Sequence, residues 1–128
     1  MTYKEVFTML NSIQYTESTA TIPCAYFMFP EDDPSNPAPP PPFLCYYYEG
    51  SDDLKADDTN YQKIRPLTIE LYTDNKDFAL EEKVEDALKS GGLVFSRTEE
   101  YISTEHLYMV TYESEIIVTE ELPNGEQS

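Results

Sequence analysis

The residue best suited to acid–base chemistry is the single histidine, His106, which falls in a short polar stretch between two strand-like segments. As a general base it would need a hydrogen-bonding partner and a cleft, and the adjacent residues 103–105 specify neither. The chain also contains no glycine-rich phosphate loop, no nucleophile elbow and no HExxH pattern. We therefore interpret His106 as an exposed turn residue and predict that the protein has no catalytic residues and is not an enzyme.

An acidic loop at 50–60 is the only other segment that resembles a reactive site. Its carboxylates are Asp52, Asp53, Asp57 and Asp58. Calcium loops place oxygen ligands at alternating positions, need a glycine at the sharp turn and end in a bidentate glutamate. Here the aspartates come in adjacent pairs and no glutamate closes the loop, so we expect a solvated charged loop and predict no metal and no cofactor.

The charge balance excludes several classes of partner. Twenty-five acidic residues face 8 lysines and arginines in 128 residues, which gives a net charge of -17 and a pI near 4.1. Binding to phosphates or to anionic membranes depends on basic residues, so we predict no specific nucleic-acid binding and no membrane association. No apolar stretch is long enough for a membrane helix, and no signal peptide is visible at the N-terminus.

The two cysteines indicate a reducing compartment. Cys24 and Cys45 lie in separate apolar segments, without metal-type spacing and without the further cysteines of a disulfide framework. We interpret them as buried thiols and expect the protein in the cytoplasm of the cell that makes it.

The elements that would position any site begin with a helix at the N-terminus. Thr2 and Glu5 have the spacing of a capping box, and Val6 and Leu10 recur at helical intervals until the pattern fades near Asn11. Strand-like segments follow at 22–29 and 43–48, separated by a proline-rich connector at 30–42.

The second half of the chain supplies a long strand, a second helix and two further strands. Alternating apolar residues predict a long strand at 61–72, which we pair with 43–48 as an antiparallel hairpin. Leu80, Val84 and Leu88 mark the buried stripe of a second helix, and 93–102 and 107–118 form a closing hairpin. Residues 120–128 should be a frayed tail. This order predicts a single α+β domain, 1–128, with an antiparallel sheet, two helices packed on one face and long loops.

Surplus tyrosine is the main unusual feature besides the charge, with 11 in the chain. The run Tyr46–Tyr48 must point to both faces of its strand, and Tyr72 faces outward if its neighbours face the core. Tyrosine is enriched where protein surfaces bury each other, so these residues are a candidate interface between subunits, together with the loop aspartates Asp52, Asp53, Asp57 and Asp58. The alternative is that helices cover both faces of the sheet locally.

The order of these segments resembles a known family. The motifs that carry the resemblance are the capped N-terminal helix, Tyr-Phe-x-Phe-Pro-Glu at 26–31, Pro-Phe-Leu-Cys-Tyr-Tyr-Tyr at 42–48, Tyr61-Gln-Lys-Ile, Leu67-Thr-Ile-Glu-Leu-Tyr-Thr-Asp74, an acidic helix and Leu107-Tyr-Met-Val-Thr-Tyr-Glu113. Over roughly residues 1–118, the chain is similar to the small tail-completion or tail-terminator proteins of long-tailed phages and prophages, which act in head–tail joining and are sometimes catalogued as minor capsid proteins. The proline run at 34–42 and the segment 16–21 are longer than this family leads us to expect.

The resemblance implies a non-enzymatic structural protein of the virion, located in the tail or neck. It implies a homo-oligomeric ring, hexameric in the virion, that caps the tail tube and contacts the tube protein and the head–tail connector proteins. Repulsion between highly charged subunits predicts a monomer when the chain is isolated at low salt. A lumen lined with carboxylates would let DNA pass without sticking.

A second class of function remains open from composition alone. A soluble acidic binding protein, such as a DNA mimic that inhibits a basic host protein, has a similar size and charge. Such a mimic should space its carboxylates regularly along one helix or edge. In this sequence they cluster at 31–33, 52–58 and 81–86, which favours the structural role.

Overall fold

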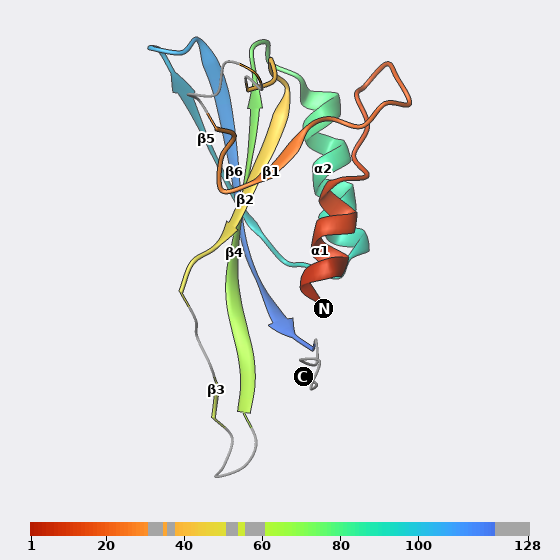
Figure 1. Ribbon diagram of the computed structural model, residues 1–128, viewed down its shortest axis with the longest axis vertical. Helices are drawn as coiled ribbons and strands as arrows, with labels where there is room; N and C mark the ends of the chain where they lie inside the picture. The colour runs from red at the N-terminus through yellow and green to blue at the C-terminus, as the bar shows by residue number, and fades with distance from the viewer. Residues whose placement is uncertain (31–34, 36–37, 51–53, 56–60, 120–128) are drawn as a thin grey trace.

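A mixed β-sheet with two helices on one face forms the protein, as the computed structural model in Figure 1 shows. The structure describes residues 1–30, 35, 38–50, 54–55 and 61–119. Its elements are α1 (Tyr3–Leu10), β1 (Cys24–Tyr26), β2 (Phe43–Tyr48), β3 (Leu54–Lys55), β4 (Tyr61–Thr73), α2 (Phe78–Ser90), β5 (Ser96–Ile102) and β6 (Leu107–Val118). The predicted α+β class, with both helices on one face, is confirmed.

Both helices begin where the sequence places capping side chains. The Glu5 backbone N–H donates to Thr2 Oγ1 at 3.0 Å, and the Thr2 backbone N–H donates to Glu5 Oε1 at 2.8 Å, which completes the capping box of α1. Asp77 caps α2 by accepting a hydrogen bond from the Leu80 backbone N–H at 3.0 Å. Neither helix in the described part of the chain is long and apolar enough to cross a bilayer.

The strands follow the order β1-β2-β4-β6-β5, and β3 pairs with β4 outside this path. The two predicted antiparallel pairings are confirmed, because Tyr46 lies opposite Ile69 in β2–β4 and Tyr101 lies opposite Tyr108 in β5–β6. The pairing of β1 with β2 is parallel, which makes the sheet mixed instead of wholly antiparallel. A parallel pair needs a connection that returns the chain along the full strand length, and the segment from β1 to β2 that contains the proline-rich connector supplies it.

The hydrophobic core lies between the sheet and the two helices. The helices contribute the buried residues Val6, Leu10, Leu80, Val84 and Leu88. The sheet contributes a second layer of buried side chains: Leu44, Tyr46, Leu67, Ile69, Leu71, Val110, Tyr112 and Ile116. The alternate strand residues point to the other face of the sheet, and no helix of the described residues covers that face (Figure 1). We call that second surface the open face.

Some predicted segments differ in the structure, and others fall outside the described residues. Leu54–Lys55 form the short strand β3 against Tyr61 and Gln62, so part of the predicted 50–60 loop is a strand paired with the start of β4 (Figure 1). The predicted strand at 22–29 shortens to β1. The four loop aspartates and the predicted frayed tail at 120–128 lie outside the described residues.

Candidate functional site

The four candidate tyrosines separate onto the two faces of the sheet. Tyr47 and Tyr72 lie on the open face, since they alternate with core residues in β2 and β4. Tyr46 is 7% exposed and its ring packs edge-on against Tyr26 at 5.2 Å. Tyr48 is half-buried on the helix side and packs against Tyr3 of α1 at 5.1 Å. Of the predicted set, only Tyr47 and Tyr72 are therefore placed together on the open face.

A groove of about 990 Å³ lies on the open face beside these two tyrosines. Its floor is formed by side chains of β2 and β4, namely Phe43, Cys45, Tyr47, Glu70 and Tyr72. One wall comes from residues 27–29 after β1 and from the connector at 38–41. The turn between β5 and β6, with Glu105 and His106, closes the far end. The groove is therefore lined by segments that are far apart in the sequence.

The rings of the groove are stacked in pairs. Phe43 stacks on Tyr72 with ring centroids 5.0 Å apart and planes inclined by 28°. Phe27 stacks on Tyr47 with centroids 5.1 Å apart and planes inclined by 29°. Phe29 packs edge-on against Phe43 at 5.4 Å. Such pairs hold each ring in a fixed orientation, so the aromatic surface of the groove is formed in the isolated chain.

Phe27 holds its place in the wall through an unusual backbone conformation. Its φ is 73°, in the left-handed region that bulky residues rarely adopt. The Met28 N–H donates to the Tyr26 carbonyl oxygen at 2.9 Å, which closes a tight three-residue turn around Phe27. The Phe27 N–H donates to the Tyr46 carbonyl oxygen at 2.7 Å and ties this turn to β2. Backbone strain of this kind is concentrated at binding sites and other functional sites.

Glu70 is the carboxylate of the groove floor, between the Phe43–Tyr72 pair and Tyr47 along the paired strands. It lies opposite Cys45 in β2 and accepts a hydrogen bond from the Tyr72 hydroxyl at 2.8 Å. Burial, and then Glu70, raise the pKa of the Tyr72 hydroxyl, which stays protonated as the donor. No lysine or arginine among the described residues forms an ion pair with Glu70.

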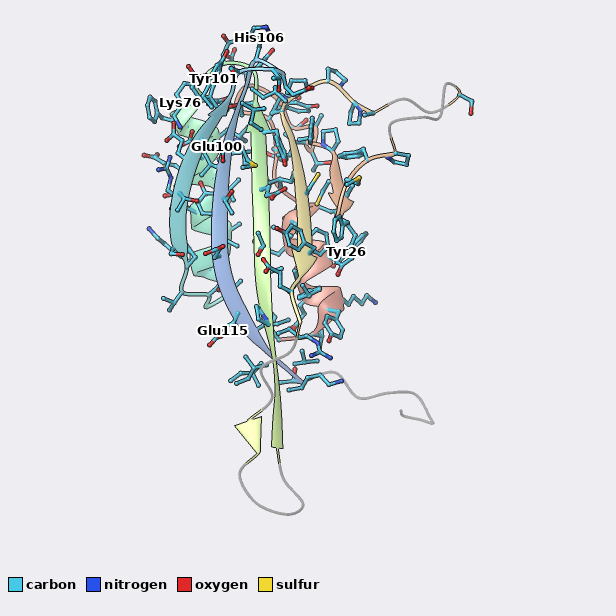
Figure 2. All side chains as sticks on the ribbon, turned by 90° about the vertical axis from the view of Figure 1, so that its left-hand side faces the viewer. Tyr26, Lys76, Glu100, Tyr101, His106 and Glu115 are labelled. Atoms are coloured by element: carbon cyan, nitrogen blue, oxygen red, sulfur yellow. The ribbon has the colours of Figure 1, made fainter. Side chains whose placement is uncertain are left out.

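Charge is distributed unevenly between the two sides of the sheet. The register places Glu70, Glu100, Glu113 and Glu115 on the open face, which is turned toward the viewer in Figure 2, where Glu100 and Glu115 are labelled. Every lysine and arginine whose side chain the structure describes lies on a helix or on the helix side of the sheet: Lys4, Lys63, Arg65, Lys76, Lys83, Lys89 and Arg97. The open face is therefore acidic without a neutralising base among the described residues.

The buried carboxylate on the helix side, by contrast, is paired. Glu81 of α2 is 3% exposed and forms ion pairs with both Lys76 and Arg97. Burial alone would lower the pKa of Lys76, but hydrogen bonds to Glu81 and Glu99 outweigh burial and raise it. A hydrogen bond from Lys76 in turn lowers the pKa of Glu99. These ion pairs connect α2 to β5 and so contribute to the stability of the fold.

The two cysteines are free thiols on adjacent strands. Cys45 points to the open face and Cys24 to the opposite side, since Cys24 lies opposite the core residue Leu44. Burial raises the pKa of Cys24 to about 12, and burial together with Glu70 raises the pKa of Cys45 to about 11. Both side chains are therefore neutral thiols near neutral pH.

His106 lies in the turn between β5 and β6, where Figure 2 shows it at the tip of the sheet. It is exposed, as predicted, and its φ of 56° suits a turn position. Its Nδ1 lies 3.4 Å from the Tyr101 hydroxyl. Within the described residues, no group of three or more histidine, cysteine, aspartate or glutamate side chains is arranged to hold a metal ion.

Sequence reasoning missed the wall and the centre of this groove. The sequence predicts Phe27, Met28 and Phe29 as strand residues, and its patterns mark neither Phe43 nor Glu70 as a candidate. The period-two alternation around Glu70 and Glu113 was a usable signal for an acidic sheet face. The left-handed conformation of Phe27 has no sequence signal, because a phenylalanine normally predicts an extended backbone.

Comparisons with known proteins give little further guidance. No protein-family model matches the chain, and no curated protein matches its sequence. Among solved structures, the chain is similar to one described as "Virion of native gene transfer agent (GTA) particle". The similarity has 14% identity over 73% of this chain and 78% of that chain, with a TM-score of 0.44. At this level the likeness establishes no shared role, and function has to be inferred from the residues of the chain itself.

Proposed function

We propose that the protein is a non-enzymatic structural component of phage virion assembly that closes into a ring, caps the tail tube and joins it to the head connector. The resemblance of residues 1–118 to tail-completion proteins motivates this role. One structural observation carries the ring: an apolar strip at the β1 edge of the sheet whose side chains are exposed among the described residues.

The strip consists of Tyr26, Phe27 and Met28, which are 52%, 56% and 58% exposed. β1 is the terminal strand of the sheet and only three residues long. Exposed apolar side chains at a free sheet edge favour association with another chain. In a ring, this edge would contact a different surface of the next subunit, which is a heterologous contact that closes on itself.

The charge of the chain opposes this contact and makes it dependent on salt. Bringing together subunits of charge -17 costs energy that falls as salt screens it over about 8–10 Å. We expect the open-face carboxylates to point to solvent, to the lumen or to a basic partner, away from the contact between subunits. Carboxylates facing the lumen would let DNA pass without binding.

Mass measurement by sedimentation across a salt series, with and without purified tail tubes, tests the ring. We expect a monomer at low salt and a closed ring, hexameric by the resemblance, at high salt or on the tubes. Met28→Ser should prevent the ring, whereas Phe7→Ser, which removes a similarly exposed side chain (55%) from α1, should not. A monomer under every condition without binding to tubes would refute the proposal.

The acidic open face supports a second candidate function, that of a soluble inhibitor of a basic protein. Its glutamates have no described base beside them and would be attracted to a positively charged surface. A strict monomer that fails to bind tail tubes but binds a basic DNA-binding protein tightly would favour this function over the ring.

A further inference from the structure

We propose that the open-face groove is a binding site for an arginine side chain of a protein partner, with the guanidinium lying between the Phe27–Tyr47 and Phe43–Tyr72 ring pairs and paired with Glu70. This inference goes beyond the ring and does not depend on it, because the groove exists in a single chain. Phe27 and Met28 belong to both the strip and the groove wall, so the arginine and a neighbouring subunit would compete for them. The argument rests on the rings, on the position of Glu70 and on the absence of a described base beside it.

The aromatic rings give the groove an affinity for a planar cation. Four rings form two stacked pairs on either side of the floor residue Cys45. A guanidinium binds over the face of such rings more often than an ammonium does, because it is planar and more weakly hydrated. The groove volume of about 990 Å³ is more than a single side chain fills, so the flanking backbone of the partner can enter as well.

Glu70 supplies the anion that a guanidinium requires. Its side chain is half-buried in the floor, and its described hydrogen bond comes from the Tyr72 hydroxyl. A carboxylate has about four acceptor positions, so most of them are free for the paired N–H groups of an arginine. Asp74 and Glu105 at the rim add negative charge that attracts a cation toward the floor.

The contrast with the helix side indicates that the partner brings the cation. There the buried carboxylate Glu81 is neutralised by Lys76 and Arg97 of the chain itself. On the open face, Glu70, Glu100, Glu113 and Glu115 have no such pairing among the described residues. The strained turn at Phe27 fits this role, because it stacks the Phe27 ring on Tyr47 in the free chain and so preorganises the groove for a ligand.

An NMR titration of the full chain with blocked tripeptides tests the site. The probe is acetyl-Gly-Arg-Gly-amide, and acetyl-Gly-Gln-Gly-amide is the uncharged control, both at about 0.15 M salt so that distant charges are screened. We expect the arginine peptide to shift the amide signals of Tyr47, Glu70 and Tyr72 in a saturable way and the glutamine peptide to leave them unchanged. A lysine peptide should bind more weakly, because an ammonium is not planar and is more strongly hydrated than a guanidinium.

Two variants separate the site from the general charge of the protein. Glu70→Gln keeps the acceptor for Tyr72 and should weaken arginine binding about tenfold, which corresponds to about 1.4 kcal/mol. Glu82→Gln removes the same charge from an exposed position of α2 and should change the affinity less than about twofold. Tyr47→Leu keeps an apolar side chain but removes a ring, and should weaken binding about fivefold.

Several results would overturn the proposal. Equal weakening by Glu70→Gln and Glu82→Gln would mean that the peptide responds only to the overall charge. Equal binding of the glutamine peptide would mean an apolar groove without cation selectivity. Groove signals that shift with protein concentration alone would mean that a second copy of the chain occupies the site. The mass measurement tests the ring, and the NMR titration tests the arginine site on a single chain. A protein that stays monomeric can still bind the arginine peptide, so the two proposals can fail separately.

Discussion

Glu81 is buried between two cations, and its replacement by alanine should destabilise the protein by about 2 kcal/mol. Removing one partner from a fully buried ion pair costs about 3–5 kcal/mol, whereas an exposed pair contributes about 0–1 kcal/mol. Glu81 itself is 4% exposed at its side chain, but Lys76 and Arg97 are 19% and 34% exposed. The expected cost therefore lies between the two limits.

The other carboxylates of the network limit the loss of stability expected for Glu81→Ala. After the substitution, Lys76 keeps an ion pair with Glu99 at 2.9 Å, and Arg97 keeps one with Glu85 at 3.4 Å. Neither cation is left wholly unpaired, so the cost should stay below the range for an isolated buried charge. The repulsion between the two cations rises at the same time, because the carboxylate that lay between them is gone.

Urea unfolding, followed by circular dichroism, measures the effect as a change in midpoint at constant slope. Glu82→Ala is the matched control on the next residue of α2, where the side chain is exposed, and it should change the free energy of unfolding by less than about 0.5 kcal/mol. If Glu81→Ala proved as stable as Glu82→Ala, the network would contribute nothing and the reasoning from burial would be wrong.

Two further predictions concern the groove. Alkylation of Cys45 by iodoacetamide at about pH 8 should be at least about a hundredfold slower in the folded protein than in urea. In the folded protein the Cys45 pKa of about 11 leaves little thiolate to react. Equal alkylation rates in the folded protein and in urea would contradict this. In urea unfolding, Phe27→Gly should be more stable than Phe27→Ala by about 1 kcal/mol. Both variants lose the ring, but only glycine adopts a φ of 73° without strain. A more stable Phe27→Ala variant would show that the left-handed turn is not maintained.

Much of the fold could be predicted because its signals are local. Thr2 and Asp77 start the helices, and the alternation around Ile69 defines the long strand and its buried face. The parallel pairing of β1 could not be predicted in this way. Three residues carry too little pattern to fix a direction, and the choice depends on how the connector returns the chain to the start of β2.

The tyrosine run shows why the candidate site could be predicted only in part. Period-two alternation guarantees that Tyr46–Tyr48 point to both faces, but the sequence does not say which face the helices cover. The answer is set by register with β4, which places Tyr46 opposite the core residue Ile69 and Tyr47 opposite Thr68 on the open face. Tyr47 becomes part of the groove because a left-handed turn holds Phe27, twenty residues earlier in the chain, against its ring. The groove therefore depends on the exact register of β2 and β4 and on the strained turn at Phe27. The residue types indicate that the two strands pair, but they indicate neither this register nor this turn.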